Sequence, residues 1–210
     1  MKRTLFLLIS CFISLSLISQ NQAETFIKEA QDLLAKKEYK QAQLSLQDAI
    51  NEINLLIGAQ IAESLPDEIN GLKSDGEENM GSGGMGMLGG GLQISKSYSN
   101  ASMKENEAEV IIMANSPLLT SMNMYLSNPA MLGPEYKSVR VGTQRAILKT
   151  ENDDYYDDKG VSKKIRVSEL QIPLNSTLIT INMKGFATEQ DELSFANKLE
   201  IEKLKVVLND

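Results

Sequence analysis

Residues 24–65 carry apolar side chains at the three- and four-residue intervals of an amphipathic helix. A polar run at 36–38 interrupts this pattern, and Gly58 and Pro66 weaken and then end it. We therefore predict helix over 24–65, with a turn near 36–38 and a buried apolar face in each half. The two faces comprise Phe26, Ile27, Ala30, Leu33 and Leu34, and then Ala42, Leu46, Ala49, Ile50, Ile53 and Ile57.

The spacing of small and large apolar residues in this region resembles one tetratricopeptide unit. The matching positions are Phe26, Ala30, Tyr39, Ala42, Leu46 and Ala49. In such a unit, small alanines let two antiparallel helices approach each other, but no second copy follows at the 34-residue period, and a solenoid needs about three units. The resemblance implies a single helical hairpin or one long bent helix, and we expect it to pack against its own domain.

Strand patterns dominate the second half of the chain, from residue 92 to residue 210. Alternating segments at 91–100 and 105–116 predict a strand pair. The segment 137–150 predicts a hairpin turning at Gly142 and Thr143, and 161–185 predicts two strands turning near Asn175 and Ser176. This order lacks a regular βαβ alternation, so it favours an α+β fold with a mostly antiparallel sheet of about six strands and helices on one face.

Two further helices are expected among these strands. Ser116 is a candidate N-cap for the first, which places Leu118, Met122 and Tyr125 on one face. Residues 188–208 predict the second, with a threonine cap, acidic residues in the first turn and a buried face of Leu193, Ala196, Leu199 and Leu204.

Residues 66–91 have almost nothing to bury, which is typical of a flexible linker or lid. Their stretch GSGGMGMLGGG contains the GxGxxG spacing, but an acidic segment precedes it and a strand pattern follows it, whereas a dinucleotide turn needs a strand before and a helix after. Met85, Met87 and Leu88 are candidate partner-binding residues that dock on an apolar groove. Met80, Met85 and Met87 are alternatively thioether ligands for Cu(I).

The first 23 residues form a secretory signal peptide by pattern: Lys2 and Arg3 precede an apolar run from Leu5 to Ile18, and a polar run ends at Ala23. The apolar run is too short for a permanent membrane span. We expect cleavage after Ala23, no membrane span in the remaining chain, and a periplasmic or secreted location.

The composition then excludes several kinds of catalytic and metal site. The chain has no histidine and no tryptophan, and its single cysteine, Cys11, lies in the predicted leader. A Ser-His-Asp triad, a thiol centre and an ordinary zinc site are therefore excluded in the exported chain. Removing Lys2 and Arg3 changes the net charge from −7 to −9, which argues against nucleic acid as a partner. No cofactor is expected.

An acidic loop is predicted at 151–160. Its carboxylates Asp153, Asp154, Asp157 and Asp158 are candidate calcium ligands, although their spacing does not match an EF-hand. A solvated hairpin loop is the competing interpretation.

The order of these segments resembles an uncharacterised family of exported bacterial proteins with an N-terminal helical hairpin and a Gly/Met-rich loop. The resemblance rests on LPxxxxGL, the Gly/Met segment, ISKSYS and SPLLTSMNMYLSNP, and it departs at Leu72, where relatives carry tryptophan. The strand-rich half also resembles the photosystem II extrinsic-protein fold. Neither resemblance implies an activity or a catalytic residue.

The leading functional hypothesis is an exported, non-enzymatic binding or accessory protein of the cell envelope. The alternatives are an envelope hydrolase that uses carboxylates or a Ser/Lys pair, and a calcium- or copper-binding envelope protein. The ligand, the partner and the oligomeric state do not follow from the sequence.

Overall fold

The computed structural model describes residues 22–82, 92–116, 118–128, 131–157 and 159–210, and at 77–82 it describes the backbone alone. Residues 1–21 of the predicted leader lie outside these ranges. The chain divides into two compact units, residues 1–59 and 60–210. In the described part of the chain, no helix combines the length and apolarity needed to cross a bilayer.

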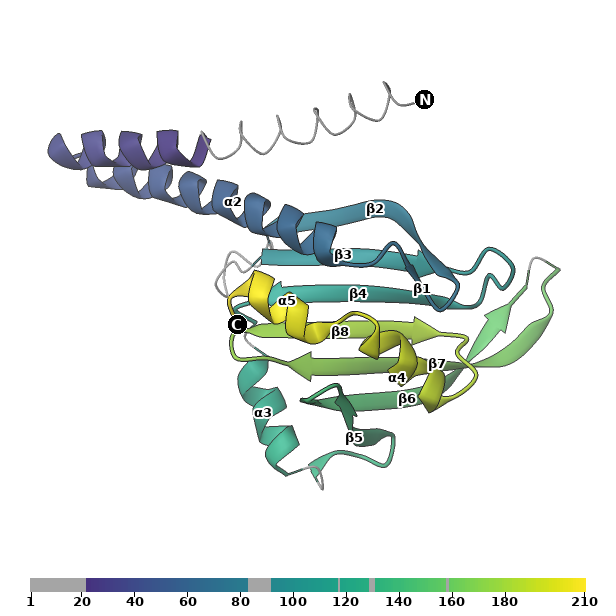
Figure 1. Cartoon of the computed structure of the whole chain (residues 1–210). Helices are drawn as coiled ribbons and strands as arrows, with labels where there is room; N and C mark the ends of the chain where they lie inside the picture. Colours follow the sequence, from purple (N-terminus) through teal and green to yellow (C-terminus); the bar gives the residue numbers. More distant parts are fainter. Residues whose placement is uncertain (1–21, 83–91, 117, 129–130, 158) are drawn as a thin grey trace. The chain divides into compact units, whose positions relative to one another are not determined.

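The first unit contains the predicted helical hairpin. Residues 22–35 are helical, Lys36 and Lys37 turn the chain, and α2 (Tyr39–Ser64) follows. Figure 1 shows the two helices side by side, so a hairpin replaces the alternative of one bent helix. The buried residues where they meet are small: Ala23, Ala30, Ala42, Ser45 and Ala49. Small side chains let the two backbones approach closely, as the tetratricopeptide spacing predicted.

The larger apolar residues of this hairpin depart from the prediction. Leu46, expected in the buried face of α2, is 43% exposed, and Ile50 and Ile53 are exposed as well. Because alanines form the contact between the two helices, these longer side chains lie outside that contact. An aspartate at position 46 is therefore not expected to unfold the hairpin on its own.

The second unit is built on an eight-stranded sheet in which every pairing is antiparallel, with the order β1-β2-β3-β4-β8-β7-β6-β5. Two four-stranded meanders therefore meet where β4 pairs with β8 (Figure 1). The strands are β1 (Glu68–Ile69), β2 (Leu72–Ser82), β3 (Leu92–Ser99), β4 (Glu107–Ala114), β5 (Tyr136–Val141), β6 (Gln144–Tyr156), β7 (Ser162–Pro173) and β8 (Thr177–Lys184). The α+β class is confirmed, but the expected number of about six strands was too low.

The two additional strands correct the linker prediction. Residues 68–69 and 72–82, assigned from composition to a flexible segment, form β1 and β2, and β2 pairs with β3 through Ser82 opposite Leu92. A bulge between Ser74 and Glu78 accommodates Gly76, whose φ is +76°. Backbone pairing with β3 makes this polar stretch a strand. Residues 83–91 lie outside the described ranges.

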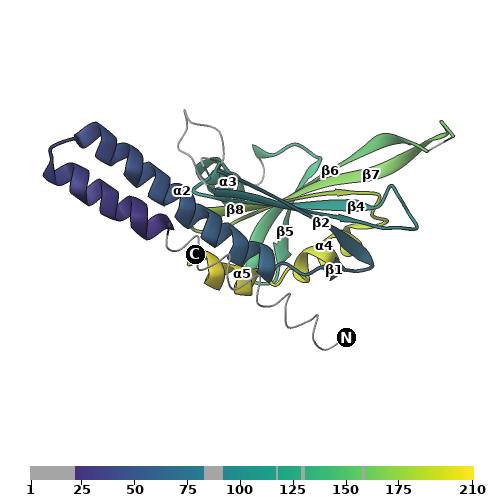
Figure 2. The ribbon, with the colours of Figure 1, turned by 90° about the horizontal axis from the view of Figure 1, so that it is seen from above.

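Helices lie on both faces of the sheet, whereas one covered face was expected. Figure 2 shows α4 (Glu189–Asn197) and α5 (Ile201–Leu208) on one side and α3 (Leu119–Ser127) on the other. The α4/α5 side holds the main core, where Phe195 packs edge-on against Tyr98 and Phe186, with ring centroids 5.5 and 5.8 Å apart. The sheet contributes Ile94, Val110, Ile112, Leu148, Leu170, Ile172, Ile179, Ile181 and Met183 to this core.

The predicted C-terminal helix is interrupted. Lys198–Glu200 separates α4 from α5, and Glu200 has a left-handed backbone with φ of 51°. The buried positions shift phase here, since Phe195, Ala196 and Leu199 are followed by Ile201 and Leu204. A break lets both segments turn their apolar sides to the sheet.

Candidate functional site

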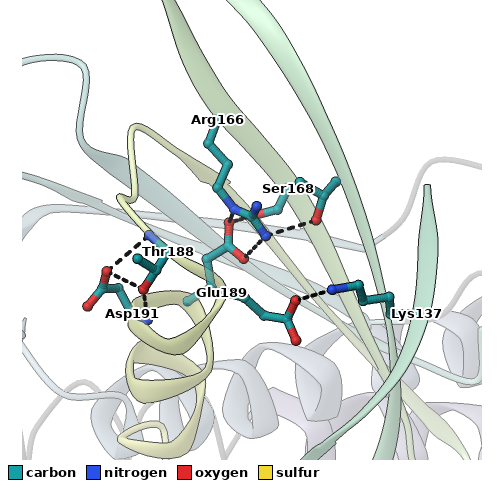
Figure 3. A network of polar contacts seen from close by, with 8 residues as sticks. Lys137, Arg166, Ser168, Thr188, Glu189 and Asp191 are labelled. Carbon is teal, nitrogen blue, oxygen red and sulfur yellow. Dashed lines mark hydrogen bonds and ion pairs between the residues drawn. The ribbon is translucent and has the colours of Figure 1, made fainter. Parts of the chain in front are cut away.

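The most buried polar cluster lies between α4 and the sheet (Figure 3). The Glu192 side chain, 1% exposed, accepts two hydrogen bonds from Arg166, Nε to Oε1 at 2.7 Å and a terminal nitrogen to Oε2 at 2.9 Å. The hydroxyl of Ser168 donates to the same carboxylate at 2.6 Å, and Arg166 also donates to Thr150 Oγ1 at 3.1 Å. The bond to Glu192 raises the pKa of Arg166, although burial opposes this.

Two further contacts hold α4 in place. Thr188 caps the helix: its Oγ1 accepts from the Asp191 amide at 3.2 Å, while the Asp191 carboxylate accepts from the Thr188 amide at 3.1 Å. Lys137 of β5 pairs with Glu189 at 2.7 Å (Figure 3). The threonine cap and the acidic first turn were predicted. Both side-chain partners of Glu192, Arg166 and Ser168, lie on β7, and Arg166 is bonded in turn to Thr150 of β6, so this cluster acts as a structural clamp that docks α4 on the sheet.

The opposite face of the sheet carries an open groove beneath α3. Met122 and Leu126 pack on Ile147 of β6 and Leu178 of β8, which anchors the helix over one corner of the sheet. Arg145 adds a hydrogen bond to the carbonyl of Leu126 at 2.5 Å. Beside this contact lies a cavity of about 450 Å³, whose walls include Leu118, Ser121, Met122, Tyr125, Met131, Leu132 and Gly133 from α3 and its flanking loops and Tyr136 from β5.

The sheet supplies a polar floor to this α3 groove. Ile147, Lys149, Glu169 and Gln171 line it from β6 and β7. Lys149 Nζ lies 2.5 Å from Glu151 Oε1 and 5.9 Å from the centroid of the Tyr136 ring, and Gln171 donates to Glu169. The bond to Glu151 raises the pKa of Lys149, so its ammonium stays charged at neutral pH. The groove therefore has an apolar wall and a floor with one held cation and one carboxylate.

The uncovered sheet face continues away from α3 as a polar surface. Lys149 and Glu169 also line a second hollow of about 330 Å³, together with Glu109, Asn182 and Lys184. Asn182 donates to Glu109 at 3.3 Å, and Lys184 pairs with Glu107 at 2.7 Å. These polar side chains already contact one another, so Asn182 and Lys184 each have a partner within the protein.

The acidic candidates do not gather into a cluster of three within the described ranges. β6 continues to Tyr156, so Asp153 and Asp154 are strand residues and not loop residues as predicted. Adjacent strand positions point to opposite faces. Asp154 pairs with Lys164 at 2.9 Å, and Asp157 Oδ1 accepts from the amides of Lys159 and Val161.

Asp158, the fourth candidate, lies outside the described residues. Within the described ranges, no group of three or more His, Cys, Asp and Glu side chains could hold a metal ion. The calcium hypothesis stays a prediction without a ligand set in this part of the chain.

The predicted partner-binding residues Met85, Met87 and Leu88 lie outside the described residues, as does the side chain of Met80. The lid and copper hypotheses therefore stay predictions. What the structure does bring together is the predicted face of Leu118, Met122 and Tyr125, all of which line the α3 groove. Sequence periodicity does not reveal the floor residues, because they lie on β6 and β7, which are distant from α3 in the sequence.

Three carboxylates at the edges of the second unit predict how its stability responds to acid. Lys163 lowers the pKa of Glu105, and hydrogen bonds from Thr143 and Gln144 lower that of Glu202. Burial raises the pKa of Asp210, but hydrogen bonds from Thr177, Ser176 and Asn175 outweigh it and the pKa is lowered.

Groups whose pKa is lower in the folded state stabilise it above their unfolded pKa, and this contribution is lost as the pH falls through the folded pKa. We expect the melting temperature, followed by circular dichroism, to fall as the pH drops below the ordinary carboxyl value of 4.5. Glu202→Gln should flatten part of that decline. A melting temperature that rises on acidification would contradict this assignment.

Comparison with known proteins adds no relative to this description. No family model matches the chain, and neither a curated protein nor a solved structure gives a significant match. The class defined by fold and site is an α+β domain with an open groove between one helix and an antiparallel sheet, and the resemblances noted from the sequence remain predictions.

Proposed function

We propose that this chain is an exported, non-enzymatic binding protein of the cell envelope that takes a ligand with an apolar body and a polar end in the α3 groove. The groove itself carries the proposal. Its volume of about 450 Å³ falls within the range of small-molecule sites, which are typically concave, mostly apolar and supplied with a few polar groups.

The α3 groove offers one surface to the apolar body of such a ligand and another to its polar end. Leu118, Tyr125 and Met131 present apolar surface from α3 and the following loop, while Lys149 and Glu169 present charge from the sheet. Leu118 and Met131 are 50% and 56% exposed, so the apolar wall is open to an incoming molecule. An apolar body burying this wall gains about 25 cal/mol for each Å² removed from water.

The rival proposal, an envelope hydrolase, needs a group poised to take a proton. A Ser/Lys pair requires a neutral lysine, but Glu151 raises the pKa of Lys149 and so keeps this groove lysine protonated. Ser168 is also engaged, because its hydroxyl donates to the buried Glu192 on the other face. These two observations count against a hydrolase that uses Lys149 or Ser168 as its Ser/Lys pair.

Filling the groove is expected to weaken binding. The full chain is expressed, recovered from the envelope fraction with an N-terminus near Glu24, and titrated with the apolar fluorophore N-phenyl-1-naphthylamine. Ser121→Trp should weaken its binding at least about tenfold, because an indole occupies the space that an apolar ligand needs. Ser121 is exposed at the groove wall, so the substitution requires no buried space.

Thr120→Trp is the matched control. Thr120 is the exposed neighbour of Ser121 on α3 and does not line the groove. Its variant should bind the fluorophore as the unaltered protein does. Equal loss in both variants, or no binding to the unaltered protein, would count against the α3 groove as the site.

A further inference from the structure

The helical hairpin of the first unit leaves its largest apolar side chains unburied. Alanines and one serine fill the contact between its helices, so the longer side chains lie outside that contact. Five of them form what we call the hairpin face: Ile27, Leu34, Leu46, Ile50 and Ile53, each between 38% and 49% exposed.

Helix periodicity places these five residues on one side of the hairpin. Leu46, Ile50 and Ile53 follow the i, i+4, i+7 spacing of a single stripe on α2, and Ile27 and Leu34 are seven residues apart on the first helix. Successive residues of a helix are about 100° apart around its axis. Viewed from the N-terminus of each helix, both stripes are rotated in the same sense from the alanine contact. Because the two helices run antiparallel, this shared sense of rotation brings both stripes to the same side of the hairpin. Leu44 and Leu55 fall on the opposite side.

The size of the hairpin face suits a stable protein interface. Five large aliphatic residues that are each 38% to 49% exposed offer on the order of 400 Å² of surface, which is comparable to the largest apolar patch of a typical monomer. A standard interface removes about 800 Å² from each partner, and a little over half of that area is apolar. The hairpin face supplies close to the apolar share of one such interface.

Charge along the hairpin face is low. Gln43 lies beside the apolar stripe of α2 and Gln31 beside that of the first helix, where Glu24 is an acidic neighbour three residues before Ile27, and Asp48 lies on the opposite side of α2. A chain with net charge −7 would repel its own copy less across this face than across a more acidic surface. Glutamine amides both donate and accept hydrogen bonds, so each can pair with the same residue across a two-fold axis.

We propose that the hairpin face is a self-association surface, through which two copies of this chain form a two-fold symmetric four-helix bundle. Each hairpin contributes two antiparallel helices, and the apolar stripes of the two copies cover each other. The proposal is independent of any ligand in the α3 groove.

Sedimentation equilibrium of the full chain tests this proposal. The unaltered protein should sediment as a dimer at about 10 µM, in the range expected for an interface of this size. The double variant Leu46→Gln with Ile50→Gln should weaken the dimer by about 100-fold or more, because two-fold symmetry removes four apolar side chains from the interface at once.

The matched control is Leu44→Gln with Leu55→Gln, which changes two exposed leucines of the same helix on its opposite side. This variant should remain dimeric. All four substituted residues are exposed, so circular dichroism should show unchanged helix content. A monomeric unaltered protein at about 100 µM, or equal weakening in the two double variants, would overturn the proposal.

Discussion

Replacing Arg166 with methionine is expected to lower the free energy of unfolding by about 3–5 kcal/mol, measured by urea denaturation. The substitution removes both guanidinium hydrogen bonds from Glu192, whose side chain is 1% exposed. A buried carboxylate that loses its cation keeps its desolvation cost, while the Ser168 hydroxyl alone remains to donate to it. This is the largest effect we expect from a polar residue.

Two companion variants separate the buried clamp from ordinary surface charge. Lys137→Met breaks the exposed pair with Glu189 and should cost less than about 1 kcal/mol. Combining Arg166→Met with Glu192→Leu removes the buried charge as well and should restore much of the lost stability, since apolar replacement of a buried ion pair is often neutral. A double variant no more stable than Arg166→Met would show that an unpaired charge is not the cause.

The Phe195→Ala variant is expected to lower the free energy of unfolding by about 3–5 kcal/mol, again by urea denaturation. Phe195 is fully buried and contacts the rings of both Tyr98 and Phe186, so truncation leaves a cavity between α4 and the sheet. Tyr98 cannot readily shift to fill it, because its hydroxyl donates to the carbonyl of Pro66 at 2.8 Å. The aromatic cluster thus ties α4 and β3 to the segment after α2.

Val206→Ala is the control for this second prediction. Val206 lies on α5 and is 81% exposed, so its truncation should change the free energy of unfolding by less than about 0.5 kcal/mol. A Phe195→Ala variant as stable as Val206→Ala would mean that α4 does not pack on the sheet as described.

Local pattern predicted those strands whose inward and outward residues alternate. β3, β4 and the hairpins β5–β6 and β7–β8 lie where alternation placed them, most clearly β4, whose inward residues are buried and whose outward residues are not, although β6 runs on to Tyr156 through the predicted acidic loop. Alternation did not predict β1 and β2, because polar residues and glycine occupy most of their positions. The dipeptide Asn70-Gly71, with positive φ at both residues, was the available signal for a hairpin there.

Only one wall of the α3 groove could be predicted from the sequence. The stripe of Leu118, Met122 and Tyr125 follows from helix periodicity, but Lys149 and Glu169 reach the same cavity through strand pairing. Periodicity likewise predicted two packed helices in the hairpin but assigned Leu46 to the buried side. An amphipathic stripe shows that a residue favours burial, and it does not show which surface will cover it.

The proposed binding groove can be tested most directly by NMR of protein labelled with ¹³C at the methionine methyl groups. Met122 and Met131 line the α3 groove, while Met183 lies in the core on the other side of the sheet. Titration with N-phenyl-1-naphthylamine should shift the methyl resonances of Met122 and Met131 and leave that of Met183 in place. Saturable binding that leaves the Met122 and Met131 resonances unmoved would contradict the account.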